Sequence, residues 1–369
     1  MGKSNEVVIV GGGVIGCSIA FHLARLGASV TLLERDLIGS HASRVGGGLL
    51  LRYLEGEEDD SYRVLVSSSH EMFPKLAQEI RELTAYDIEY LQCGVLTATD
   101  DPTELDQYRM FATQYARMPD APRMIDTAEL RELWPFAHTR YIGGVLVPNE
   151  GQVNSPRFVR GLALAAERSG ARVCEGRQVT GIKMEGNRVL GVTTDQGDLA
   201  ADLVILAAGP WTGLAGKWVG RRIPIRPVRG QVVHLHTNKQ AMSVIVHTAD
   251  AYLHQRADGT ILVGATVEEA GFDCRLTSEG VASQLRAGLA AMPALSEWSF
   301  KGAQVALRPE TDRTMPYVGK LEGIDNLIVA SGHFRNGIML APITGKLVAD
   351  MVTGRPIDPR LAGLSPDSV

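Results

Sequence analysis

Residues 6–16, EVVIVGGGVIG, contain the most informative pattern in this sequence. Residues 7–10 are all apolar and predict a buried strand, and the glycines after them precede a predicted helix over residues 14–26. Gly11, Gly13 and Gly16 form the pattern Gly-x-Gly-x-x-Gly, which permits a tight turn and a close approach of the backbone to a pyrophosphate. The helix N-terminus would offer free N–H groups and a positive dipole end to the phosphates. The stretch therefore predicts a dinucleotide-binding unit.

A carboxylate ends the second strand of this unit. The strand is predicted over residues 29–34, and Glu34 stands where such units place the acid that accepts hydrogen bonds from the ribose hydroxyls. Arg35 follows it and raises the alternative of a 2′-phosphate, which the neighbouring carboxylate disfavours.

Glycine-rich turns farther along the chain favour FAD over NAD as the cofactor. One lies in residues 43–48, a second ends the apolar strand predicted over residues 203–207, and a third follows the strand predicted over residues 326–330. The fingerprint by itself serves both cofactors. A long cofactor that crosses the whole domain, however, needs cofactor-facing turns this far apart in the sequence, so we expect FAD.

The order of the predicted elements indicates two interleaved domains. Strands and helices alternate at both ends of the chain, whereas residues 227–304 alternate as antiparallel strands with one helix near residues 278–291. We expect an α/β fold, in which a FAD-binding Rossmann-like domain of the glutathione-reductase type interleaves with an α+β antiparallel-sheet substrate domain. The FAD-binding domain would comprise residues 1–85, 147–225 and 305–369, and the substrate-binding domain residues 86–146 and 226–304.

Local signals place the other helices. One helix is predicted over residues 61–83 with an interruption at Pro74, because proline removes a backbone donor inside a helix. Capping boxes at residues 101–104 and 126–129 each predict a short helix, and Ser155-Pro156 predicts another through about residue 169.

Composition narrows the function classes. A formal net charge of -5 over 369 residues gives no reason to expect a nucleic-acid partner or an anionic membrane. The four cysteines lack the spacing of a zinc site or a disulfide framework. The chain enters its first strand too early for a signal peptide, and no apolar run approaches the ~20 residues of a membrane span. We therefore expect a cytoplasmic enzyme with no bound metal.

Seven motifs are spread over nearly the whole chain: GGGVIG (11–16), LLERD (32–36), SHASRVGGG (40–48), ILAAGPW (205–211), RPVRGQ (226–231), LRPETDRTMPYVG (307–319) and SGHFRNGIMLAPITG (331–345). With these motifs the chain resembles the D-amino-acid oxidase-like FAD-dependent oxidoreductases, and among them the bacterial glycine oxidases associated with thiamine biosynthesis. It departs from the family's pattern at residues 45–47 and 50–53, near the expected active-site entrance.

The resemblance, together with the fingerprint glycines, implies a set of FAD-binding residues. It also implies a homotetramer that uses O2 and hands its imine product to thiazole synthesis. The cofactor set is Gly11, Gly13, Val14, Ile15, Gly16, Glu34, Arg35, Ala42, Ser43, Gly47, Gly48, Leu49, Val179, His333, Phe334, Arg335, Asn336, Gly337, Ile338 and Met339.

The resemblance assigns Arg308 and Arg335 to the substrate carboxylate, which the hydroxyl of Tyr252 would also reach. Arginine suits this role because its planar fork gives a carboxylate two charge-assisted hydrogen bonds, each contributing roughly 1.5–3 kcal/mol. Hydride can pass directly from the α-carbon of the neutral amine to flavin N5, so we expect no catalytic acid or base. His333 is accordingly expected to act through its backbone. The helix that begins near Gly337 would stabilise the negative charge of reduced flavin.

The leading hypothesis is the oxidative deamination of glycine or another small amino acid. Amino acid, O2 and water would give the α-keto acid (glyoxylate from glycine), ammonia and H2O2. One alternative is a flavin dehydrogenase for D-amino acids, sarcosine or proline that passes electrons to a quinone or a partner protein. Another is a non-catalytic flavin-binding subunit.

The acidic run at residues 55–60 is expected to be a solvated loop or an active-site lid. Four histidines in the strand-rich middle of the chain are expected to be surface or packing groups: His234, His236, His247 and His254.

Overall fold

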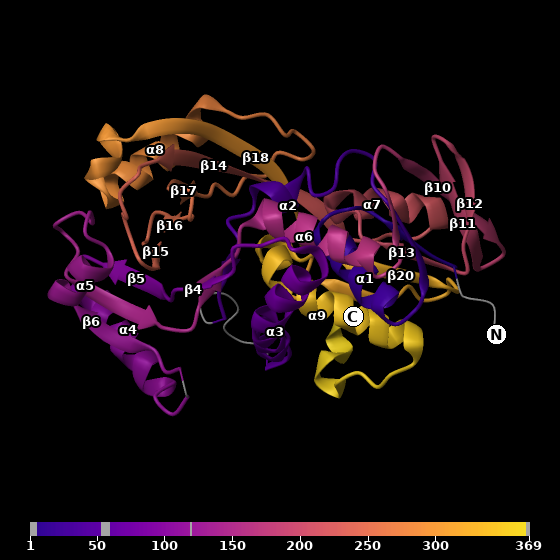
Figure 1. Cartoon of the computed structure of the whole chain (residues 1–369), viewed down its shortest axis with the longest axis horizontal. Helices are drawn as coiled ribbons and strands as arrows, with labels where there is room; N and C mark the ends of the chain where they lie inside the picture. Colours follow the sequence, from indigo (N-terminus) through magenta and orange to yellow (C-terminus); the bar gives the residue numbers. More distant parts are fainter. Residues whose placement is uncertain (1–5, 53–59, 119, 367–369) are drawn as a thin grey trace.

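The computed structural model describes residues 6–52, 60–118 and 120–366, and its two largest sheets lie toward opposite ends of an elongated molecule (Figure 1). The first sheet has the strand order β19-β20-β13-β1-β2-β9 and is parallel except for β19 at its edge. Its strands are β1 (Glu6–Val10), β2 (Ser29–Leu33), β9 (Arg172–Cys174), β13 (Leu203–Leu206), β19 (Tyr317–Lys320) and β20 (Leu327–Ser331).

Alternate residues of β1 face two different cores, as the two-residue period of a strand requires. Val7 and Ile9 pack into the core that the helices cover, whereas Val8 and Val10 pack into a core on the opposite face. On the helical face, α1 contacts both α9 and α6, and α3 contacts the same two helices. These helices are α1 (Val14–Arg25), α3 (Asp60–Thr84), α6 (Ser155–Arg168) and α9 (Gly337–Thr353).

The opposite face carries a small antiparallel sheet of β10 (Val179–Glu185), β11 (Arg188–Thr194) and β12 (Gly197–Ala200). Val189 and Val192 of β11 are buried against β13 and β20 in this core. The first sheet is thus covered on both sides, which explains the continuous apolar sequences of its central strands.

The second large sheet has eight strands in the order β18-β14-β17-β16-β15-β5-β7-β6. Its pairs are antiparallel, except that β15 and β5 run parallel. Helix α8 (Ser278–Ala291) packs against β14 and β17 on one face. The strands are β5 (Val95–Thr99), β6 (Arg123–Asp126), β7 (Gly143–Val147), β14 (Ile225–His236), β15 (Ile245–His247), β16 (Tyr252–Gln255), β17 (Thr260–Gly264) and β18 (Ser299–Thr311).

Short elements complete the described chain. A third sheet joins β3 (Leu49–Leu50), β8 (Gly151–Gln152) and β4 (Leu91–Gln92). The remaining helices are α2 (Ala42–Val45), α4 (Pro102–Gln114), α5 (Thr127–Leu133), α7 (Thr212–Ala215), η1 (Gly209–Trp211), η2 (Gly216–Val219), η3 (Pro293–Glu297), η4 (Phe334–Asn336) and η5 (Pro359–Leu364).

The expected α/β fold with an antiparallel second domain is confirmed, and so are the predicted N-caps. The Asp101 side chain accepts from Thr103 N–H at the start of α4, and that of Asp126 accepts from Glu129 N–H at the start of α5. β7 and β18 run across the expected domain boundaries at residues 147 and 305, and the division itself stays a prediction.

The interruption predicted at Pro74 is wrong, because α3 continues through it. Pro74 lies on the exposed side of the helix, while Phe73, Leu76 and Ile80 are buried in the core beneath. Burial of this apolar face outweighs the cost of one missing backbone hydrogen bond.

The acidic run at residues 55–60 lies outside the described residues apart from Asp60, which begins α3. In the described chain, no helix combines the length and the apolar character needed to cross a membrane.

Candidate active site

A single cavity of about 770 Å³ extends from the carboxyl ends of the parallel strands to the eight-stranded sheet. Its wall is formed by residues from β1, the turn before α2, β10, the strand end after β13, the second sheet and the turn before α9. A crevice outside the carboxyl ends of a doubly wound sheet is where such folds bind ligands. The volume is in the range of cofactor and substrate sites.

The fingerprint forms one end of this cavity, and close backbone contacts leave no room for a side chain at Gly11 or Gly16. Gly11 has φ +110°, and a Cβ there would lie 2.5 Å from the carbonyl oxygen of Ala207. A Cβ on Gly16 would lie 1.9 Å from the carbonyl oxygen of Gly11, so Gly16 is needed for the contact of α1 with the turn. Gly13 is the N-cap of α1, whose described first turn contains no acidic side chain. The positive end of α1 therefore faces the cavity.

Glu34 and Arg35 lie where the fingerprint predicted them. Glu34 is 7% exposed; its Oε2 accepts from Gly12 N–H at 2.7 Å, and its Oε1 accepts from Asp36 N–H at 2.9 Å. The guanidinium of Arg35 lies over the ring of Trp211, 4.0 Å from its centroid. Both residues line the cavity, with the Trp211 ring beside them.

His333 shows the strongest signal for a bound group at the opposite wall. It is 3% exposed; its Nε2 lies 3.0 Å from the Thr344 hydroxyl, whereas its Nδ1 has no hydrogen-bond partner in the described chain. Burial lowers the pKa of His333 to about 3, so the ring is neutral. Because an unpaired buried polar atom is costly, Nδ1 fits a hydrogen bond to a molecule in the cavity that His333 lines. The side chain, and not only the backbone expected from the sequence, is therefore available to a cofactor.

The N-terminus of α9 is a second feature that fits a bound group. Its N-cap, Asn336, makes no side-chain capping hydrogen bond, and the described first turn contains no acidic residue. Gly337 lines the cavity at this helix end, so the backbone N–H groups and the positive dipole end are directed toward a ligand there.

One face of the second sheet forms the other end of the cavity. Val232 is directly opposite Gly264 in the β14–β17 pair, and Gly264 is directly opposite Tyr252 in the β17–β16 pair. Residues directly opposite share a face of a sheet. Gly230, two residues before Val232, shares it as well, and all four residues line the cavity.

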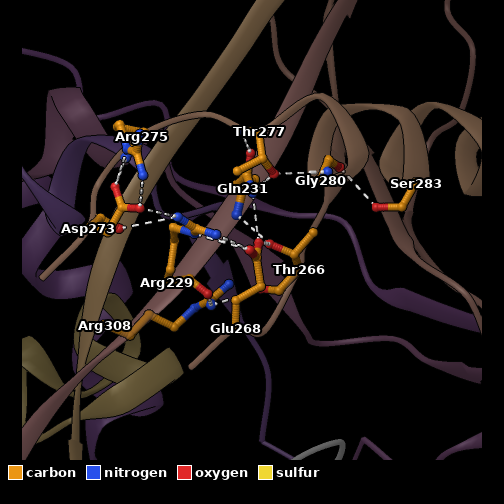
Figure 2. A network of polar contacts seen from close by, with 10 residues as sticks. All are labelled: Arg229, Gln231, Thr266, Glu268, Asp273, Arg275, Thr277, Gly280, Ser283 and Arg308. Atoms are coloured by element: carbon orange, nitrogen blue, oxygen red, sulfur yellow. Dashed lines mark hydrogen bonds and ion pairs between the residues drawn. The ribbon is translucent and has the colours of Figure 1, made fainter. Parts of the chain in front are cut away.

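Arg308 lies flat against this face. Its Nη1 donates to the carbonyl oxygens of Thr266 at 2.9 Å and Arg229 at 3.3 Å (Figure 2). A Cβ on Gly230 would lie 2.2 Å from Nη1, so only glycine leaves room for the guanidinium. Arg335 is exposed and lines the same cavity from the turn before α9. Its guanidinium carbon, Cζ, lies 5.4 Å from the centroid of the Phe334 ring.

The structure brings nearly all the residues predicted from the sequence to this cavity. Gly16 lies outside the lining, in the contact between α1 and the turn, and Met339 is a core residue that is 1% exposed. The predicted residues that line the cavity are Gly11, Gly13, Val14, Ile15, Glu34, Arg35, Ala42, Ser43, Gly47, Gly48, Leu49, Val179, Tyr252, Arg308, His333, Phe334, Arg335, Asn336, Gly337 and Ile338.

His247 and Trp211 are among the cavity-lining residues that were not predicted from the sequence. His247 is opposite Tyr252 in the β15–β16 pair, and burial together with the charge of Arg335 lowers its pKa. Trp211 follows β13, whose carboxyl end meets that of β1 at one sheet edge, a signal that the sequence already contained. By contrast, His254 is fully buried and bonded to Gln152, as expected for a packing group.

A doubly wound sheet with a dinucleotide fingerprint, joined by one cavity to an arginine-bearing antiparallel sheet, defines a dinucleotide-dependent oxidoreductase. The chain belongs to the FAD dependent oxidoreductase family, whose model matches residues 6–351. Its cofactor is therefore FAD. The Nδ1 atom of His333, which no described residue bonds, and the two helix N-termini at the cavity fit such a group.

The chain is similar over nearly its full length to proteins named glycine oxidase. It is 33% identical to that of Pseudomonas aeruginosa, over 96% of this chain and 97% of the relative. The crystal structure of glycine oxidase from Geobacillus kaustophilus superposes with a TM-score of 0.93 at 30% identity and covers 99% of both chains. The chain is also 29% identical to the bifunctional protein ThiO/ThiG of Trichormus variabilis, over 97% of this chain and 54% of that protein.

Proposed function

We propose that this protein oxidatively deaminates glycine or another small amino acid. The observation that carries the proposal is the placement of Arg308 on the cavity face of the second sheet, in the same cavity as the dinucleotide fingerprint. A guanidinium in that position suits a substrate with a carboxylate. The two full-length relatives named glycine oxidase support the same substrate class.

Three side chains would bind the substrate carboxylate. Arg308 and Arg335 supply two positive charges from two different walls of the cavity, and Tyr252 adds a hydroxyl donor from β16. Two cations and a donor that converge on one carboxylate fix which hydrogen of the α-carbon faces the cofactor. The small size of the substrate remains part of the proposal.

The other residues would bind FAD and shape the reaction. Bound FAD would supply the two-electron acceptor for the α-carbon C–H bond, and O2 would be the final oxidant, reduced to H2O2. The chain itself contributes the helix N-terminus at Gly337, which favours negative charge in the ring system. It also contributes a neutral His333 and a His247 of lowered pKa, so neither ring adds a positive charge near the substrate amine at neutral pH. Water then hydrolyses the imine to the α-keto acid and ammonia.

The cellular setting is proposed on narrower grounds. The relatives named ThiO/ThiG support the hand-over of the imine product to thiazole synthesis. The resemblance to glycine oxidases favours a cytoplasmic homotetramer.

Anaerobic titration of the purified protein with glycine, sarcosine and D-alanine tests the proposal. We expect glycine to bleach the flavin absorbance band and, in air, to consume one O2 for each H2O2 formed. Bleaching without oxygen consumption would favour the dehydrogenase alternative. A coloured protein that none of the three substrates bleaches would favour the non-catalytic flavin-binding subunit.

A further inference from the structure

A hydrogen-bonded network lies directly behind Arg308, between β14 and the segment that follows β17 (Figure 2). After the regular pairing of β17 ends, this segment continues along β14. Thr266 N–H donates to the carbonyl oxygen of Gln231 at 3.1 Å, and Arg229 and Glu268 exchange backbone hydrogen bonds of 2.9 and 3.0 Å. Residues 266–268 therefore form an irregular extension of the sheet.

The position of Arg308 depends on this extension. The two carbonyl groups that accept from its Nη1 belong to Thr266, within the extension, and to Arg229, on the strand that the extension pairs with. The carbonyl oxygen of Arg229 also accepts the N–H of Glu268. If the extension moved away from β14, the guanidinium would lose its shorter backbone contact.

The carboxylate of Glu268 is the centre of the network. Its Oε2 accepts from Arg229 Nε at 3.0 Å and Nη2 at 2.6 Å, and its Oε1 accepts from Gln231 Nε2 at 2.7 Å and from the Thr266 hydroxyl. Burial opposes the ionisation of Glu268, but the hydrogen bonds from Thr266, Gln231 and Arg229 outweigh it and hold its pKa below the ordinary value. The Arg229 side chain is only 10% exposed, so solvent screens this pair less than a surface pair.

Gln231 connects the network to α8. Its side chain is fully buried, and its Oε1 accepts from Thr277 N–H at 2.9 Å. The Thr277 hydroxyl in turn caps α8 by accepting from Gly280 N–H at 3.1 Å. Glu268 is thus bound to a strand and, through Gln231, to the start of a helix, which are two rigid elements.

We propose that Glu268 is a positioning residue for substrate binding. It clamps residues 266–268 to β14 and so fixes the Arg308 guanidinium together with Val267, whose side chain lines the same cavity. This inference rests on the proposed role of Arg308 in binding the substrate carboxylate. It also gives the motif RPVRGQ, residues 226–231, a function, because Gly230 leaves room for Arg308 while the residues on either side of it hold Glu268.

Acetate binding tests the clamp in the FAD-loaded protein, because acetate carries the carboxylate without an oxidisable amine. Its Kd is measured from the change in the flavin absorbance spectrum. We expect Glu268→Ala to raise the Kd about tenfold, the effect of losing part of a charge-assisted contact. Glu268→Gln should raise it less, because its amide oxygen still accepts from Arg229. The KM for glycine should rise in parallel, with a smaller change in kcat. Arg286→Ala is the control: this side chain is 64% exposed and pairs with Glu279 on α8, away from Arg229 and Glu268, and its loss should leave the Kd unchanged.

A double-mutant cycle decides whether Glu268 acts through Arg308. In the Arg308→Gln background, Glu268→Ala should cause no further rise in the acetate Kd. An equal rise in both backgrounds would overturn the proposal, because Glu268 would then act through the general fold. If Glu268→Ala does not raise the acetate Kd in the wild-type background, the clamp is overturned and the role of Arg308 stays intact. An unchanged Kd in Arg308→Gln itself would overturn the proposed function and the clamp together. If Glu268→Ala does not retain FAD, Glu268→Gln takes its place in the cycle.

Discussion

At Gly230, a single hydrogen atom in place of a side chain leaves room for a guanidinium group. The Nη1, Cζ and Nη2 atoms of Arg308 all lie within 2.3 Å of the position that a Cβ would occupy. The guanidinium thus stacks on the backbone of β14 and cannot share that space with any side chain.

Gly230→Ala should therefore displace Arg308 without disturbing the cofactor. We expect the KM for glycine to rise about tenfold or more, since a charge-assisted contact contributes roughly 1.5–3 kcal/mol and each 1.4 kcal/mol is tenfold. Oxygen-electrode kinetics give the KM, and the flavin absorbance of the purified protein gives the FAD content, which should not change. Gly363→Ala is the matched control, because a Cβ there meets no atom within 4 Å. An unchanged KM in Gly230→Ala would contradict the role of Arg308.

His254 makes the stability of the protein depend on pH. Burial, followed by the charges of Arg256 and His234, lowers its pKa from 6.5 to about 3. As pH falls below 6.5, the unfolded chain takes up a proton at this position and the native protein does not. The contribution of His254 to the free energy of unfolding is therefore fully present above pH 6.5 and is lost progressively toward pH 3. One such proton gives a slope of about 1.4 kcal/mol per pH unit.

His254→Gln should reduce the pH dependence of the free energy of unfolding by about that slope between pH 6.5 and 4.5. Equilibrium urea unfolding at several pH values measures it. The same variant should show no altered slope above pH 7.5, which serves as the internal control. An identical slope below pH 6.5 in both proteins would mean that the native imidazole does take up the proton.

Some residues of the cavity could be predicted from the sequence, and others could not. The location of Gly11, Gly13 and Glu34 at the cavity was predictable because the dinucleotide motif has a defined geometry, and that of Arg308 and Arg335 followed from the resemblance. The place of His247 in the cavity was not predictable, because it depends on the register of β15 with β16, and register follows from tertiary packing. The availability of the His333 side chain to a ligand was not predictable either, because it is the burial of the ring that leaves Nδ1 without a partner among the described residues.

Among the elements, β1 and α1 meet at a junction that leaves no room for a side chain at Gly16. Gly16→Ala should force α1 away from Gly11, since its Cβ would lie 1.9 Å from a backbone oxygen. We expect a loss of about 1–3 kcal/mol in the free energy of unfolding, typical of overpacking, together with a lower FAD content. Urea unfolding and flavin absorbance measure the two effects. Gly181→Ala on β10, where the Cβ would be 3.8 Å from Thr193, should change neither.

A substitution at the start of α9 should weaken cofactor binding without weakening folding. Among the described residues, a Cβ at Gly337 would have only His333 within 4 Å, at 3.8 Å, and the glycine has an ordinary helical backbone. Gly337→Leu should therefore fold at least as well as the parent apoprotein, because leucine is the better helix former. It should bind FAD about tenfold more weakly, since its side chain enters the cavity and loses contacts of about 1.4 kcal/mol. Flavin fluorescence titration measures the Kd; unchanged FAD affinity would show that this helix end does not face the cofactor.

Helices and strands were well predicted where periodicity and caps agree, as for α1, α8 and α9. The error at Pro74 arose because proline was weighed as a local signal, whereas α3 is stabilised by its contacts with α6 and α9. β14 begins at Ile225, before the strand-rich region predicted from residue 227, because its first residues pair with β18. Such long-range pairing leaves little trace in a single sequence.

At the scale of the whole molecule, one cavity connects segments from residue 10 to residue 338. A cofactor in it contacts stretches that are remote in sequence, so FAD should stabilise the protein cooperatively. Removal of FAD should lower the free energy of unfolding by about 2.7 kcal/mol relative to protein with FAD at 100 times its Kd. Urea unfolding of the apo and reconstituted proteins measures this difference. Equal stabilities would mean that FAD binds the native and unfolded chains alike.

β14 is anchored in both cores of the molecule. Ile225, at its start, is buried with the strands of the first sheet, and Leu235, near its end, is buried under α8. Because this strand is paired along its length with β18, a continuous pair of strands joins the two halves of the protein (Figure 1). We therefore expect the two halves to keep their arrangement during turnover, with amino acid entering and product leaving through local movements at the rim of the cavity.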